Sequence, residues 1–142
     1  TVSAGQTTVF SDYKLGWYYA SQSLGNITGG AGDDFFMVGT STVGSTIQTG
    51  AGNDVLSVGG FGITSGLAKA ISDFTLGSDV VRVGGQSITS ANLSSIVTAS
   101  ASGSDTRLVI DLDGAGAGLT TYALTLTGLT YNAANTATIF GV

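Results

Sequence analysis

The sequence of 142 residues contains no cysteine, histidine, proline or glutamate. The lack of cysteine excludes disulfide bonds, and the lack of both cysteine and histidine removes the usual zinc ligands. Basic residues are scarce, with 4 Lys and Arg against 9 acidic residues, so no basic patch can neutralise the phosphates of a nucleic acid. No apolar run is long enough to span a membrane, and we expect no N-terminal signal peptide in these residues.

Glycine and small β-forming residues dominate what is present. The chain has 23 Gly, is 42% hydrophobic and only 9% charged. Abundant Thr, Val, Ile and Ser between recurring turn signals predict a single all-β domain. All the acidic residues are Asp, which favours turns and short-reach metal coordination. Because His, Cys and Glu are missing, few acid, base or nucleophile types remain, and we do not expect an enzyme.

Two nine-residue segments share one pattern. Residues 29–37 read Gly-Gly-Ala-Gly-Asp-Asp-Phe-Phe-Met, and residues 49–57 read Thr-Gly-Ala-Gly-Asn-Asp-Val-Leu-Ser. Both fit G-G-x-G-x-D-x-U-x, where U is a large apolar residue, except that Thr49 replaces the first glycine. The glycines permit a tight turn, and the apolar residue after the aspartate starts a strand. This repeat is typical of a parallel β-roll that binds calcium.

The spacing of the two aspartates indicates a metal site. Asp34 and Asp54 lie 20 residues apart, close to the roughly 18 residues of a coil made from two such repeats. The two extra residues are expected near residues 39–44. Stacked carboxylates would repel each other, and Ca²⁺ between them would relieve the repulsion. The alternative interpretation is a pair of ordinary solvated turns.

The predicted calcium ligands combine side-chain and backbone oxygens. The carboxylates come from Asp34 and Asp54. The turn residues whose carbonyls are free of side-chain shielding are Gly29, Ala31, Gly32, Gly50 and Gly52. Asp73 follows Asp54 by 19 residues and would either close a second calcium site against the turn at residues 50–54 or only cap a turn. Asp79 would lie in the next turn, and Asp12 has looser spacing.

The remainder of the chain is divided around this roll, which we place at residues 27–83. Residues 1–26 are expected to form early coils or a cap, and residues 17–19 (Trp-Tyr-Tyr) are core residues or, alternatively, a sugar-stacking platform. Residues 84–142 form a C-terminal cap. In it we expect one short helix within residues 88–98, a hairpin at residues 106–129 whose bend includes Asp113, and a final strand at residues 136–142 with Ile139 and Phe140 inward.

These motifs together resemble the repeats-in-toxin family. The two nonapeptides are followed by Ile-Ser-Asp-Phe at residues 71–74 and Gly-Ser-Asp-Val-Val at residues 77–81. Residues 108–114 and 124–129 are similar to the C-terminal target domain of type I-secreted proteins. The resemblance covers about residues 25–130. It implies export from a Gram-negative bacterium through a type I exporter, and folding outside the cell on binding calcium.

We therefore expect a calcium-dependent folding and secretion module at the C-terminus of an extracellular protein. The alternative is a structural cell-surface protein, such as a surface-layer, adhesin or filament subunit, assembled through calcium. Low charge and many Thr and Ser residues suit either function.

Overall fold

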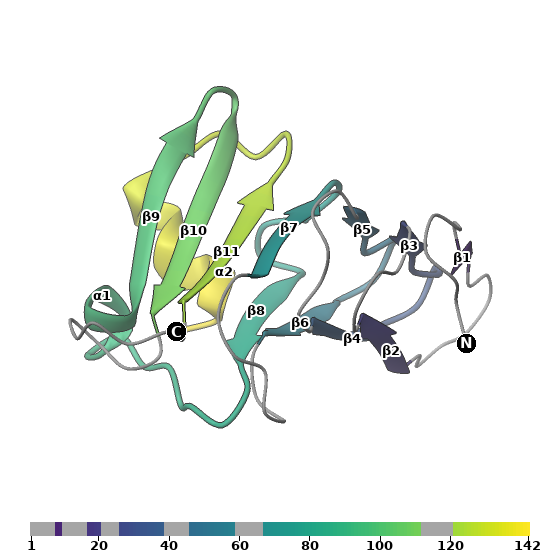
Figure 1. Cartoon of the computed structure of the whole chain (residues 1–142), viewed down its shortest axis with the longest axis horizontal. Helices are drawn as coiled ribbons and strands as arrows, with labels where there is room; N and C mark the ends of the chain where they lie inside the picture. The colour runs from purple at the N-terminus through teal and green to yellow at the C-terminus, as the bar shows by residue number, and fades with distance from the viewer. Residues whose placement is uncertain (1–7, 10–16, 21–25, 39–45, 59–66, 112–120) are drawn as a thin grey trace.

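The fold is mostly β, as the composition predicts. The computed structural model describes residues 8–9, 17–20, 26–38, 46–58, 67–111 and 121–142. Within these residues the strands form two sheets (Figure 1). The first sheet contains, in spatial order, β1 (Thr8–Val9), β3 (Ile27–Thr28), β5 (Thr46–Gln48), β7 (Leu67–Ile71), β11 (Thr121–Leu126), β10 (Asp105–Asp111) and β9 (Val97–Ser102). The second contains β2 (Trp17–Ala20), β4 (Phe35–Val38), β6 (Val55–Val58) and β8 (Val80–Val83).

Strands β1 to β8 alternate between the two sheets along the chain. From β3 to β8, each strand pairs in parallel with the strand two places earlier, so the chain coils and returns to the same sheet after every second strand. The Cα register places Phe35 beside Val55 and Val55 beside Val80. The first of these coils is therefore 20 residues long, as the aspartate spacing predicted, while the next is longer. Strands β1 and β2 continue the same pairing, which favours early coils over a separate cap at the N-terminal end.

The C-terminal part continues the first sheet with strands that alternate in direction. Strands β9, β10 and β11 form an antiparallel meander, and β11 joins β7 in parallel (Figure 1). The predicted hairpin is confirmed, although its bend with Asp113 lies outside the described residues. Strand β9 was missed because Ile96 and Val97 were assigned to a helix, whereas the β-branched Val97 begins the strand.

The helices are short and only partly match the prediction. The expected helix at residues 88–98 is reduced to the single turn α1 (Leu93–Ile96), whose N-terminus has no side-chain cap. The final strand predicted at residues 136–142 is wrong: a 3₁₀ turn η1 (Ala133–Asn135) leads into helix α2 (Thr136–Phe140). Gly141 ends α2 in the left-handed conformation, at φ 68°, and its N–H donates to the carbonyls of Ala137 and Thr138.

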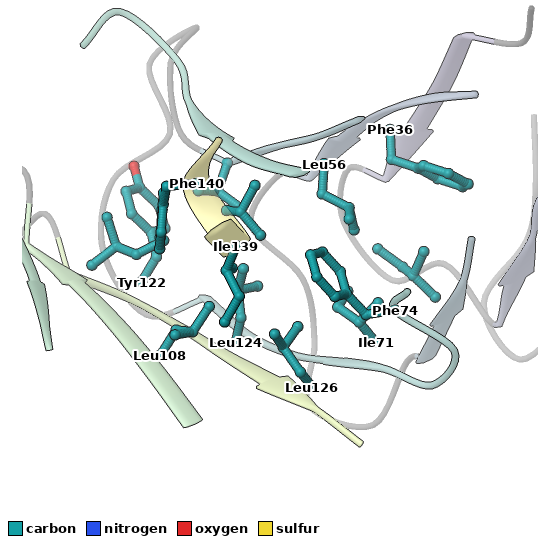
Figure 2. Packing of buried hydrophobic residues seen from close by; sticks show 14 of the residues in the cluster. Phe36, Leu56, Ile71, Phe74, Leu108, Tyr122, Leu124, Leu126, Ile139 and Phe140 are labelled. Carbon is teal, nitrogen blue, oxygen red and sulfur yellow. The ribbon is translucent and has the colours of Figure 1, made fainter. Parts of the chain in front are cut away.

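One hydrophobic core runs through both parts of the molecule. Figure 2 shows α2 placing Ile139 and Phe140 beside core residues from the two sheets. The fully buried large side chains are Phe36, Ile47, Leu56, Ile71, Leu108, Ile110, Tyr122, Leu124, Leu126 and Ile139. In strands such as β6 and β10, buried residues alternate with less buried ones, because successive side chains of a strand point to opposite faces. Ile139 and Phe140 do point inward as expected, but from a helix.

Helix α2 is therefore expected to be a structural part of the core. Replacing Ile139, which is 1% exposed, with alanine should lower the free energy of unfolding by about 2–5 kcal/mol through loss of buried contacts and creation of a cavity. The matched control is Thr138→Ala, an exposed position in the same helix, which should change stability by less than about 0.5 kcal/mol. Urea unfolding measures both variants, and equal effects would show that α2 does not contribute to the core.

Candidate metal site

The two glycine-rich turns lie directly on each other. The register of β4 and β6 places the turn at residues 29–34 against the turn at residues 49–54. The Gly29 N–H donates to the Gln48 carbonyl at 2.8 Å, and the Ala51 N–H donates to the Gly30 carbonyl at 3.0 Å. The Asn53 N–H donates to Asp33 Oδ1 at 2.8 Å. The predicted backbone ligands Gly29, Ala31, Gly32, Gly50 and Gly52 all belong to these two stacked turns.

Glycine is required where the turns approach most closely. Gly50 has φ 96° and Gly52 has φ 132°, a region that residues with a side chain rarely adopt. A Cβ atom at Gly52 would lie 2.7 Å from the Gly32 carbonyl oxygen, and one at Gly50 would overlap the Gly30 carbonyl oxygen. The repeat glycines therefore permit two backbones with many carbonyl oxygens to pack against each other.

Three aspartates form a buried column beside these turns. The Asp34 N–H donates to Asp54 Oδ1 at 2.8 Å, and the Asp54 N–H donates to Asp79 Oδ1 at 3.1 Å. Their exposed fractions are 2%, 0% and 1% for Asp34, Asp54 and Asp79. The structure thus brings Asp34 and Asp54 together as predicted, and it adds Asp79, which was not among the predicted site residues. The signal for Asp79 was its place directly before β8, equivalent to that of Asp54 before β6.

Asp73 lies on the same edge of the coil but at a different position. Because Ile71 aligns with Ile47, Asp73 aligns with Thr49 at the start of the turn, rather than with Asp54 at its end. Its Oδ1 accepts hydrogen bonds from the Thr49 N–H at 2.6 Å and the Thr49 hydroxyl at 3.0 Å. Its Oδ2 accepts from the Gly50 N–H at 3.1 Å. Asp73 therefore binds the backbone of the neighbouring turn.

Within the column, the buried carboxylate of Asp54 is the one that is least compensated by hydrogen bonds. Its Oδ2 is buried and has no hydrogen-bond partner. Burial raises the pKa of this carboxyl from 3.8 to about 7; the hydrogen bond from the Asp34 N–H opposes the rise, and the charges of neighbouring aspartates, Asp79 first, add to it. An unpaired buried carboxylate is costly, and a bound cation would remove that cost.

The donor set at this edge suits a hard cation. Carboxylate and backbone carbonyl oxygens are the ligands that Ca²⁺ takes, in a flexible shell of about six to eight. In the described part of the chain, no three acidic side chains already converge closely enough to form a metal group by themselves. Carbonyl oxygens or waters would have to supply the remaining ligands. Asp12 lies outside the described residues.

Comparison with protein-family models gives no match, and comparison with curated proteins also finds no relative. Among the helices that the structure describes, none has the length and apolar character needed to cross a membrane.

The close approach of the turns leads to a prediction for Gly50. Gly50→Ala should destabilise the protein by more than about 3 kcal/mol, because the new Cβ combines a strained φ with a collision against the Gly30 carbonyl. Gly77 is the matched control, since it has a similar φ of 89° but open space around its Cβ position. Gly77→Ala should cost only about 1 kcal/mol. Thermal unfolding compares the two, and equal losses would contradict tight stacking of the turns.

The raised pKa of Asp54 predicts an unusual pH dependence in calcium-depleted buffer. Between about pH 4 and pH 7 the folded state holds a proton on Asp54 that the unfolded state has released, so this residue makes stability fall as pH rises. From pH 5 to pH 8 the loss should reach up to about 3 kcal/mol. Urea unfolding of the wild type and of Asp54→Asn isolates the effect. Parallel pH profiles for the two proteins would contradict it.

Proposed function

We propose that this chain is a calcium-dependent folding module, and that it forms the C-terminal part of a protein secreted by a type I exporter from a Gram-negative bacterium. The metal would bind at the edge of a short parallel β-roll formed by β1 to β8. The observation that carries the proposal is the buried, unpartnered Oδ2 of Asp54 within a column of three stacked aspartates. The chain itself would have no catalytic role.

The charge balance of the column supports a cation. Among the described contacts of Asp54, Asp73 and Asp79, none involves a basic side chain. Their carboxylates are held by backbone N–H groups and one hydroxyl, which leave the summed negative charge in place. Two stacked glycine turns supply carbonyl oxygens beside this charge. Ca²⁺ would neutralise the carboxylates and use these carbonyls as further ligands.

Calcium binding of this kind would make folding depend on the calcium concentration of the compartment that holds the chain. A ligand that binds only the folded state stabilises it by RT ln(1 + [L]/Kd), which is about 2.7 kcal/mol at a hundredfold excess over Kd. In a cytosol with little free calcium the fold would lack this contribution, and the chain would stay suited to export. External calcium would then favour the folded state. The type I route itself is supported by the motif resemblance alone.

The second candidate function is a structural cell-surface protein assembled through calcium. Within the described residues, β1 pairs with β3 and β2 pairs with β4, so these two strands lie at the ends of their sheets. The edge of a parallel coil is a place where a second chain can add its strands. Light scattering separates the two candidates: growth in mass with calcium favours a structural subunit, whereas a monomer at all calcium concentrations favours the folding module.

A calcium titration tests the proposed metal site. Wild-type protein should gain at least about 2.7 kcal/mol of stability at a calcium concentration a hundredfold above Kd. Asp54→Asn keeps an oxygen that can accept from the Asp34 N–H but removes the charge. It should equal or exceed the wild type in chelator and gain less than half as much from calcium. Asp34→Ala and Asp54→Ala should also blunt the gain.

Asp105→Asn serves as the matched control. Asp105 accepts a hydrogen bond from the Gly128 N–H at 2.9 Å in the C-terminal meander, away from the stacked turns. The variant should retain the full calcium response of the wild type. Circular dichroism and thermal unfolding follow all the proteins. Identical spectra and melting temperatures of the wild type with calcium and with chelator would refute the proposed function.

A further inference from the structure

One hydrogen bond from the backbone to the aspartate side chain is present in the first and third turns of the column and missing in the second. In the first turn the Gly30 N–H donates to Asp34 Oδ2 at 2.8 Å, four residues along the chain. In the third turn the Thr75 N–H donates to Asp79 Oδ2 at 2.7 Å, again four residues along. The equivalent bond in the second turn would join the Gly50 N–H to Asp54 Oδ2. It is missing, because the Gly50 N–H donates to Asp73 Oδ2 instead.

Asp73 holds the Gly50 N–H from a well-anchored position. Its other oxygen is bound by both the N–H and the hydroxyl of Thr49, so the side chain is fixed at the start of the second turn. The first turn has no such competitor, since the residue aligned one coil later with Gly29 is Thr49, which carries no carboxylate. Asp73 therefore gives the second turn a carboxylate that the first turn lacks at the equivalent position.

We propose that Asp73 is a positioning residue: by taking the Gly50 N–H, it leaves Asp54 Oδ2 open and makes the second turn the place where calcium binds first. This inference rests on the proposed function. A cation that coordinates Oδ2 of Asp34 or Asp79 competes with a backbone N–H for that oxygen, whereas Oδ2 of Asp54 has no hydrogen-bond partner. A hydrogen bond to a charged acceptor is strong enough to change an equilibrium constant about tenfold or more.

The charges around Asp54 add to this preference. The Thr49 hydroxyl lies 3.0 Å from Asp73 Oδ1 and 3.3 Å from Asp79 Oδ2. A hydroxyl has one hydrogen to donate, so it can shield only one of these two carboxylates at a time. Asp73 and Asp79 thus place further negative charge beside the second turn, and this raises the local attraction for a divalent cation.

Calorimetric titration of the full chain with CaCl₂ tests the role of Asp73. Asp73→Ala frees the Gly50 N–H to bond to Asp54 Oδ2, so the affinity of the tightest calcium site should fall at least tenfold. Asp73→Asn has one oxygen that can still accept from the Gly50 N–H while its NH₂ group donates to the Thr49 hydroxyl, so its affinity should fall by clearly less than that of Asp73→Ala. Equal losses in the two variants would overturn the proposal, because they would make Asp73 a direct ligand.

The order of binding gives a second measurement that a purely structural role of Asp73 would not change. In the wild type, the NMR signal of the side-chain carboxyl carbon of Asp54 should respond at lower calcium concentration than that of Asp34. In Asp73→Ala this order should disappear. If the carboxyl signal of Asp34 responds first in the wild type, the inference fails even though calcium binds. No calcium binding at all would instead refute the proposed function.

Asp105→Ala controls for the general loss of an amide acceptor, since it removes the acceptor of the Gly128 N–H at 2.9 Å. It should lower the melting temperature without changing calcium affinity. If Asp73→Ala does not fold, Asp73→Asn and the binding order in the wild type decide the question. A loss of more than tenfold in Asp73→Asn then overturns the proposal.

Discussion

Carboxylates that hold the backbone of the preceding coil are the interaction on which the parallel half of this molecule depends. Asp54 binds the amide of Asp34, and Asp79 binds the amide of Asp54, so each coil is joined to the next at the same point before a strand of the second sheet. Hydrogen bonds with a charged acceptor are about twice as strong as neutral ones. They fix the register of strands that are only two to five residues long between β3 and β8.

The same arrangement concentrates negative charge in a buried place. Every additional coil that uses an aspartate in this way adds a carboxylate to the column, and backbone N–H groups orient these carboxylates without cancelling their charge. The rise in the pKa of Asp54 is the direct consequence. A protein with few basic residues can relieve such a column by protonation or by a cation. Glycine in the adjoining turns allows the coils to stack closely, and it leaves carbonyl oxygens accessible to a cation.

The sequence predicted the parts of this arrangement that depend on a regular repeat. Asp34 and Asp54 stack because both follow a turn of the same length and precede strands that pair. The third turn departs from the repeat: seven residues, 73–79, span what six span in the earlier turns. The coil before it is also longer, because Ile47 pairs with Ile71 at an interval of 24 residues, whereas Ile27 pairs with Ile47 at an interval of 20. Counting one regular coil from Asp54 therefore led to Asp73, whereas the strand after Asp79 sets the true alignment. Helix α2 and strand β9 were missed for a different reason, since tertiary packing of Ile139 and Val97 decides their conformation.

The continuous first sheet explains how so few repeats can be part of a stable fold. Strand β11 lies beside β7, so Leu124 and Leu126 of the meander join one core with Ile47 and Ile71 of the coil. The coil thus adds strands to a core that the C-terminal part already supplies, and it does not have to stabilise itself through many turns. Folded proteins are stable by only about 5–15 kcal/mol. A few kcal/mol gained or lost at the aspartate column is therefore a large share of the stability of the whole fold.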